Sequence, residues 1–219
     1  MSINRRARRP RTANPQKPRR QNERRLSFPH QLAWAAIGLV LTIGGTFIEA
    51  SATNFPWQWS EQGVVVIPLK ISFQIAAVLF VGCMGGAKAA ALSQVVYVLL
   101  GLIGLPIFTQ GGGPGYIQEL TFGYILGFIP GAWICGSLAL RAKAQLESLA
   151  FSCLCGLAMI HLTGITYLAG LQLLSPIGEG LMALIGDIIR YSVHFFPRQL
   201  VLVCTVSVLS FCLRRIMFY

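Results

Sequence analysis

Residues Gly101 to Gly131 read GLIGLPIFTQGGGPGYIQELTFGYILGFIPG, and this stretch decides how the rest of the chain is interpreted. Apolar, helix-like sequence enters it, and apolar sequence with regularly spaced glycines leaves it. The segment between them, Gln110 to Tyr116, is predicted to be neither helix nor strand, because glycine adopts φ > 0 freely and Pro114 lacks a backbone N–H. Irregular backbone is tolerated in a membrane only where it is buried in protein or lines a cavity. We therefore predict that this loop forms a wall or lid of a ligand site.

The composition is that of an integral membrane protein. Apolar residues make up 54% of the 219 residues and charged residues only 11%. The net charge of +11 would suit a nucleic-acid partner, but ten of the eighteen Lys and Arg precede Leu26 and the others lie between or beside apolar runs. Such a distribution reports membrane topology, so we predict a multi-pass protein of the cell membrane that contacts lipid and binds no nucleic acid.

The chain divides into a basic tail, residues 1–28, and a membrane domain, residues 29–219. The tail has almost nothing to bury and is predicted to be disordered and cytoplasmic. The membrane domain is predicted to be an all-α bundle of six transmembrane helices, at about residues 32–49, 64–84, 89–105, 119–140, 149–174 and 198–215. An amphipathic segment, residues 181–189, is predicted to lie at the interface. Placing both termini in the cytoplasm makes every short cytoplasmic turn basic.

The candidate ligand site is a set of polar and loop residues at the outer side of this bundle. Lys70 and Gln74 are four apart in the second predicted helix and share a face, where Lys70 either faces a cavity or extends to the near interface. Backbone N–H groups of the loop, with Lys70, Arg190 or Arg198, would hold a carboxylate. The predicted substrate-binding residues are Lys70, Gln74, Gln110, Gly111, Gly112, Gly113, Tyr116, Thr121, Gly123, Tyr124, Arg198 and Gln199.

No catalytic or metal chemistry is predicted. The three histidines fit no metal-binding or triad pattern, and His161 is interpreted as a satisfied core residue. The six cysteines all fall within apolar runs and are interpreted as small buried hydrophobic residues. No cofactor is expected. On the first helix, Gly38, Thr42 and Thr46 are four apart and form a small-residue stripe suited to close helix contact.

At these residues the sequence resembles the BioY family, the biotin-specific S components of energy-coupling factor (ECF) transporters. The resemblance is carried by LLGLIGLPIF at Leu99–Phe108, the glycines after it, TFGYILGF at Thr121–Phe128, and PLKISFQ at Pro68–Gln74. It implies a six-helix S component that captures biotin at the outer side. It also implies a membrane T component and two ATPase subunits as partners, with the stripe Gly38, Thr42 and Thr46 contacting the T component. The chain has no P-loop of its own.

One segment departs from the family pattern. Before its last helix the family has Pro-Gly-Asp-x-x-Lys, whose Asp and Lys belong to the biotin site, whereas this chain has Pro197 to Leu202, PRQLVL. Gln199 takes the place of the Asp, and its amide can both donate and accept toward a ureido group. Leu202 takes the place of the Lys and cannot hold a carboxylate, so Arg198 or Lys70 would have to substitute.

The sequence thus predicts a biotin-binding S component without chemistry of its own, and three alternatives remain open. The first is an S component for another small vitamin. The second is a membrane scaffold or assembly factor whose glycines serve only helix packing, which predicts a filled bundle without a cavity. The third is a small intramembrane enzyme in which His161 or His194 meets an acidic residue. A transporter predicts instead that Lys70, Gln199 and the glycine-rich loop converge on one pocket and that His161→Ala is tolerated.

Overall fold

The computed structural model describes residues 28–53, 66–141, 145–174 and 180–217. In chain order the elements are α1 (Phe28–Phe47), β1 (Glu49–Thr53), β2 (Val66–Ser72), α3 (Gln74–Ile103), the 3₁₀ helix η2 (Pro114–Gln118), α4 (Phe122–Arg141), α5 (Leu146–Leu174), α6 (Gly180–Ile188), the π-helical turn η3 (Ile189–Val193) and α7 (Phe196–Met217). The basic tail, except for its last residue, lies outside the described residues.

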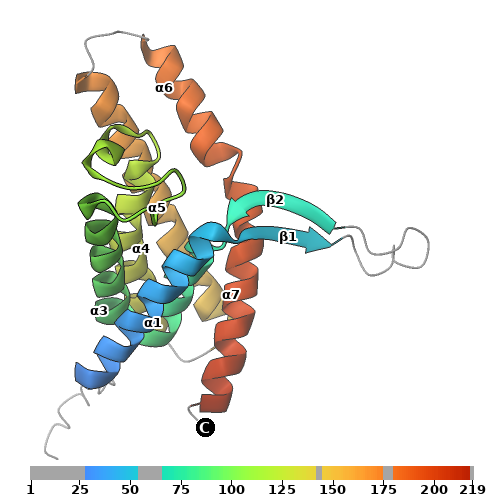
Figure 1. Cartoon of the computed structure of the whole chain (residues 1–219). Helices are drawn as coiled ribbons and strands as arrows, with labels where there is room; N and C mark the ends of the chain where they lie inside the picture. Colours follow the sequence, from blue (N-terminus) through green and yellow to red (C-terminus); the bar gives the residue numbers. More distant parts are fainter. Residues whose placement is uncertain (1–27, 54–65, 142–144, 175–179, 218–219) are drawn as a thin grey trace, which may run out of the picture.

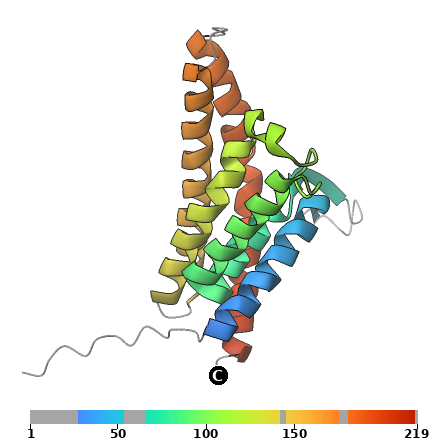
Figure 2. The ribbon, with the colours of Figure 1, turned by 60° about the vertical axis from the view of Figure 1, so that its left-hand side comes forward.

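Five helical segments are long and apolar enough to cross a membrane, judged by length and composition. They are Phe28–Phe47, Gln74–Ile103, Phe122–Arg141, Leu146–Leu173 and Met182–Met217. The long helices run alongside one another, and the short hairpin of β1 and β2 projects from the side of the bundle (Figures 1 and 2). The predicted class of fold, an all-α membrane bundle, is confirmed.

The helical segment α3 folds back on itself at Gly86. This residue has φ 78° and ψ 175°, a backbone conformation essentially restricted to glycine. The Nε2 atom of Gln74 donates a hydrogen bond to the Tyr97 hydroxyl at 2.7 Å. A straight helix would hold these two residues roughly 34 Å apart, at a rise of about 1.5 Å per residue. The two arms of α3 are therefore antiparallel neighbours, and the predicted turn at Gly85 and Gly86 is confirmed.

The segment before Gln74 is a strand, where the sequence analysis predicted helix from residue 64. Val66–Ser72 forms β2 and pairs antiparallel with β1, with Glu49 opposite Ser72 and Thr53 opposite Val66. Val66 and Ile67 favour strand, and a residue that precedes a proline, here Pro68, is disfavoured in a helix. The prediction that Lys70 and Gln74 share one helix face is therefore wrong, because Lys70 belongs to β2 and Gln74 begins α3.

The Gly86 turn and the ends of several helices lie close together at one end of the bundle. A Cβ atom on Gly85 would lie 2.8 Å from Cβ of Trp34 in α1, and one on Gly136 in α4 would lie 2.5 Å from the backbone nitrogen of Ala87. Arg214, near the end of α7, donates to the carbonyl of Ala139 at 2.9 Å. The first residues of α1 and the last of α7 lie at this same end (Figures 1 and 2).

The glycine-rich loop follows α3 and lies at the end of the bundle opposite the Gly86 turn. Gly113 N–H donates to the Gly101 carbonyl at 2.7 Å, and Phe108 pairs with Gly111 in a short bridge. Phe108 is buried beneath the loop, 4.7 Å from the ring of Tyr116 between centroids. The prediction that Gln110 to Tyr116 contains no helix is wrong from Pro114 onward, where η2 begins, because proline is well suited to the first turn of a helix.

Candidate functional site

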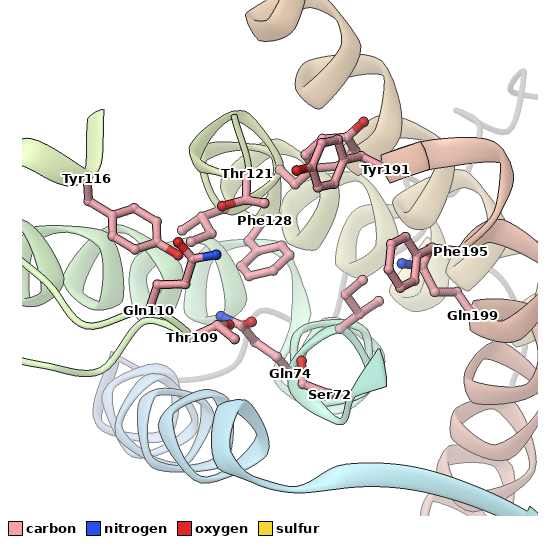
Figure 3. Close-up of a pocket in the computed structure, with 13 residues that line it drawn as sticks. Ser72, Gln74, Thr109, Gln110, Tyr116, Thr121, Phe128, Tyr191, Phe195 and Gln199 are labelled. Carbon is pink, nitrogen blue, oxygen red and sulfur yellow. The ribbon is translucent and has the colours of Figure 1, made fainter. Parts of the chain in front are cut away.

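A cavity of about 190 Å³ lies at the loop end of the bundle (Figure 3). Its walls come from β2, both ends of the glycine-rich loop, and the helices α3, α4 and α7, with η3 at one side. The lining residues are Ser72, Gln74, Ile75, Thr109, Gln110, Tyr116, Thr121, Tyr124, Ile125, Phe128, Tyr191, Phe195 and Gln199. Ligand pockets for drug-sized molecules measure about 300–1,000 Å³, so this cavity suits a smaller molecule.

Gln74 contributes an amide to one wall of the cavity. It is the first residue of α3, directly after the strand β2 and Phe73. Its Nε2 atom is used to donate to the Tyr97 hydroxyl, which in turn donates to the carbonyl of Ile107 at 2.9 Å. The buried Tyr97 thereby fixes the Gln74 side chain against the loop. The Oε1 atom of Gln74 has no part in this chain of bonds and remains an acceptor for a ligand.

Gln199 contributes a second amide, and a chain of three side chains orients it. Its Oε1 atom lies 2.6 Å from Nε2 of His161, and Nδ1 of His161 lies 3.2 Å from the Ser192 hydroxyl. Ser192 is 2.7 Å from the Tyr124 hydroxyl. Because an amide oxygen only accepts, Nε2 of His161 carries the proton, Nδ1 accepts from Ser192, and Ser192 accepts from Tyr124. The NH₂ group of Gln199 is left to donate to a ligand.

Thr121 adds an unsatisfied hydroxyl to the cavity wall. It lies immediately before α4, and its Oγ1 atom is buried without a hydrogen-bond partner among the described residues. A buried polar atom of this kind costs about 1–3 kcal/mol unless a partner arrives. Rings and branched chains fill the rest of the surface, including Phe128, Ile125 and Phe195. The site therefore combines apolar walls with a few oriented polar groups, as small-molecule sites do.

Half of the predicted substrate-binding residues line this cavity. They are Gln74, Gln110, Tyr116, Thr121, Tyr124 and Gln199. The predicted glycines do not line it. Gly112 and Gly123 permit close packing beside it, because a Cβ on Gly112 would overlap the carbonyl of Leu105 and one on Gly123 would overlap Tyr167, whereas Gly111 and Gly113 have open space around them and positive φ angles. Arg198 is adjacent to the site, with its guanidinium carbon 6.0 Å from the centre of the Phe195 ring. Lys70 lies in β2 two residues before Ser72.

The stripe on α1 packs inside the chain. Thr42 is fully buried and accepts a hydrogen bond from Nε2 of Gln94 at 3.0 Å, and Thr46 lies 3.3 Å from the Tyr97 hydroxyl. A Cβ on Gly38 would meet the side chains of Val81 and Ser93. The predicted close helix contact is thus made with α3. Contact of Gly38, Thr42 and Thr46 with a partner protein stays a prediction.

Several residues of the site were not predicted from the sequence. His161 and Ser192 hold Gln199 in place, and Tyr191 and Phe195 line the cavity. His161 was correctly expected to be a satisfied buried residue. Nothing in its apolar surroundings in the sequence indicates that its partner is an amide of the cavity wall. The intramembrane-enzyme alternative needed an acidic partner for a histidine, and His161 instead contacts an amide and a hydroxyl.

Fold and site together define a multi-helix membrane protein with a small, partly polar cavity near one end of its bundle. The chain matches the profile of the BioY family over residues 20–218 and belongs to that family. It is therefore a multi-pass membrane protein of a transporter family and not an enzyme.

Named relatives and one solved structure resemble the chain. It is 29% identical to an uncharacterised 21.2 kDa protein of the psbX–ycf33 intergenic region of Cyanophora paradoxa, over 85% of this chain and 95% of that one. It is 36% identical to a probable biotin transporter of Lysinibacillus sphaericus over 48% of this chain and 55% of the relative. The crystal structure of an S component for biotin from an ECF-type ABC transporter superposes with a TM-score of 0.62 at 21% identity, covering 84% of this chain and 90% of that one, which supports the fold.

Proposed function

We propose that this chain is the substrate-binding S component of a biotin transporter, which captures biotin at the outer side of the membrane. One observation carries the proposal: two amides, Gln74 and Gln199, contribute to the same cavity, one left with an acceptor and the other with a donor. The relatives named as biotin transporters, from Lysinibacillus sphaericus, Rhizobium etli and Thermotoga maritima, support biotin as the ligand.

The ureido ring of biotin carries one carbonyl and two N–H groups, which complement these amides. In our proposal a ureido N–H donates to Oε1 of Gln74, and the ureido carbonyl accepts from the NH₂ group of Gln199. Thr121 supplies a further hydroxyl at the cavity wall. The sulfur-containing ring packs against the apolar walls near Phe128, since thioether sulfur makes favourable contacts with aromatic rings.

The carboxylate of biotin needs a cation that the family's usual position does not supply here. Leu202, at the position of the family's Lys, is buried in the core among Leu157 and Val206. We propose Lys70 or Arg198 as the carboxylate partner. Lys70 lies in β2 two residues before Ser72, which lines the cavity. Arg198 directly precedes Gln199 and lies over the ring of Phe195.

The proposal includes six membrane crossings with both termini in the cytoplasm. The reversal at Gly86 supports two crossings within α3. The first residues of α1 and the last residues of α7 lie at the same end of the bundle (Figure 1). That end carries the basic residues Lys88, Arg141, Arg214 and Arg215, as a cytoplasmic face should. Exposed apolar residues such as Val40, Trp133 and Phe151 would contact lipid. Coupling would come from a membrane T component and two ATPase subunits.

A second candidate is an S component for another small neutral molecule. It is favoured by the cavity lining, in which none of the described residues is charged. The scaffold alternative is disfavoured by the same cavity, because a bundle devoted only to helix packing would be filled.

Calorimetric titration of the detergent-purified chain tests the proposal. We expect biotin to bind at one site per chain and desthiobiotin, which keeps the ureido group, to compete. Lipoic acid, which has a similar acid tail and no ureido group, should not compete. Folded protein that binds neither biotin nor desthiobiotin would refute biotin as the ligand, and a panel of uncharged vitamins would then test the second candidate.

A further inference from the structure

Three cysteines from three helices meet at the other end of the bundle from the cavity. Cys83 of α3, Cys135 of α4 and Cys153 of α5 place their sulfur atoms within 4.8 Å of one another. The Sγ atom of Cys83 is 3.8 Å from that of Cys135 and 3.4 Å from that of Cys153. All three side chains are fully buried. The sequence predicts only that these cysteines are small buried residues, and the folded chain brings their thiols together.

We propose that Cys83, Cys135 and Cys153 form a binding site for one thiophilic monovalent metal ion, Cu(I). Three sulfurs placed about 2.3 Å from a central ion in one plane would be about 4.0 Å apart. The two separations from Cys83, 3.8 Å and 3.4 Å, are slightly shorter than that value, and the third is no more than 4.8 Å, so modest side-chain rotations would close the site. Thiolates are soft ligands and select Cu(I) or Zn²⁺ over harder ions.

The number of ligands favours Cu(I) over Zn²⁺. Structural zinc sites are almost always four-coordinate. Within the part of the chain that the structure describes, the group contains these three cysteines and no fourth His, Cys, Asp or Glu. The three thiols lie in an apolar core cluster with Leu79, Leu149 and Leu157, which disfavours water as a fourth ligand. Three sulfurs complete the coordination of Cu(I).

Two polar groups of α7 suit a site that becomes anionic when it binds the ion. Arg214 is buried, and its Nη1 atom donates to the carbonyl of Ala139, one helical turn after Cys135. Ser210, one turn before Arg214, is fully buried beside Cys83, and its hydroxyl lacks a hydrogen-bond partner among the described residues. A fixed positive charge and a spare donor both stabilise thiolates in a low-dielectric interior.

Binding in this scheme exchanges protons for the ion. Each thiol that coordinates as a thiolate releases one proton, and copper stays in the +1 state, so no oxidant or reductant is consumed. The bound ion would tie α3, α4 and α5 together near the Gly86 turn. Because it favours the folded chain, it should also raise the unfolding temperature, by an amount that grows with the logarithm of its free concentration.

The test uses the full-length chain in detergent, reduced and handled anaerobically. Tetrakis(acetonitrile)copper(I) is added, competition with bathocuproine disulfonate measures the affinity, and X-ray absorption at the copper edge counts the sulfur neighbours. The matched control variant carries Cys155→Ser, Cys204→Ser and Cys212→Ser together, which removes only cysteines outside the cluster. We expect one Cu(I) per chain with three sulfur neighbours in both wild type and control, and at least tenfold weaker binding in Cys83→Ser.

Two results would overturn the proposal. One is equal copper binding by Cys83→Ser and wild type, and the other is loss of copper in the control variant. Gel filtration and thermal unfolding show whether Cys83→Ser folds. If it does not, the copper stoichiometry and sulfur count of the control variant alone test the proposal. Nitrogen or oxygen neighbours at its copper, or preference for Zn²⁺ over Cu(I), would then contradict the site. Since biotin is not involved, failure of biotin binding leaves this test unaffected.

Discussion

Nε2 of His161 lies 2.6 Å from Oε1 of Gln199, which joins the middle of α5 to the first turn of α7 beside the cavity. This bond fixes which end of the Gln199 amide a ligand meets. The histidine ring is itself held edge-on between Tyr124 and Phe196, with centroids 5.7 Å and 5.6 Å away. His161 is therefore a positioning residue for the proposed ligand site.

Replacing His161 with alanine should weaken biotin binding, contrary to the tolerance that the sequence analysis expected. Loss of the bond frees the Gln199 amide to rotate and costs about 1–3 kcal/mol, or roughly tenfold to a hundredfold in affinity. Calorimetry on His161→Ala, Gln199→Ala and the double variant measures this. We expect the double variant to bind about as weakly as Gln199→Ala alone, because the two side chains act as one unit.

The control for this series is Thr166→Ala. Thr166 lies on the same helix as His161, and its exposed hydroxyl bonds only to the carbonyl of Leu162. Its replacement should leave biotin affinity unchanged. Fully additive losses in the double variant would show that His161 acts on stability and not through Gln199.

Removing the second amide should have a comparable effect. Gln74→Leu deletes the acceptor for a ureido N–H and leaves the Tyr97 hydroxyl without its donor, so biotin affinity should fall roughly tenfold to a hundredfold. Gln94→Leu is the matched control, because Gln94 is an equally buried amide on α3 that bonds to Thr42 and Ser93 and does not line the cavity. The control should unfold at lower temperature but bind biotin normally. Equal affinity losses in both variants would contradict a specific role for Gln74.

Much of the fold and half of the candidate site follow from the sequence for identifiable reasons. Apolar length and basic turns locate the helices, and the glycines at Gly85 and Gly86 mark the reversal inside α3. The segment at Lys70 was misassigned because its apolar content outweighed the strand preference of Val66 and Ile67 before Pro68. Periodicity alone does not separate a short apolar strand from the start of an apolar helix.

The rest of the site depends on contacts between residues far apart in the chain. His161 and Gln199 are 38 residues apart, and the thiols of Cys83 and Cys153 are 70 apart. No local pattern encodes such pairs, since each residue sits in an ordinary apolar helix. The inward face of the α1 stripe was missed for the same reason: small residues predict close packing without naming the partner helix.

Comparing biotin with its uncharged amide should show whether Lys70 or Arg198 binds the carboxylate of biotin. If either side chain pairs with it, its replacement by alanine will weaken biotin binding about tenfold and leave the uncharged biotin amide unaffected, because only the charged tail loses a partner. Titration of both ligands into Lys70→Ala and Arg198→Ala measures the difference. Arg215→Ala, an exposed cation at the far end of α7, serves as control. Equal binding of biotin by wild type and both variants would exclude the two residues as carboxylate partners.

Replacing Gly86 at the turn of α3 should be costly. Its φ of 78° with ψ of 175° is strained for any side chain, and a Cβ atom there would also overlap Leu140. Gly86→Ala should therefore destabilise the fold by about 1–3 kcal/mol, at roughly 2–4 °C in unfolding temperature per kcal/mol for a chain of this size. Gly170→Ala, at a helical glycine with open space around it, should leave the unfolding temperature equal or higher. Thermal unfolding in detergent compares them, and equal temperatures for the two variants would show that the arms of α3 do not depend on this reversal.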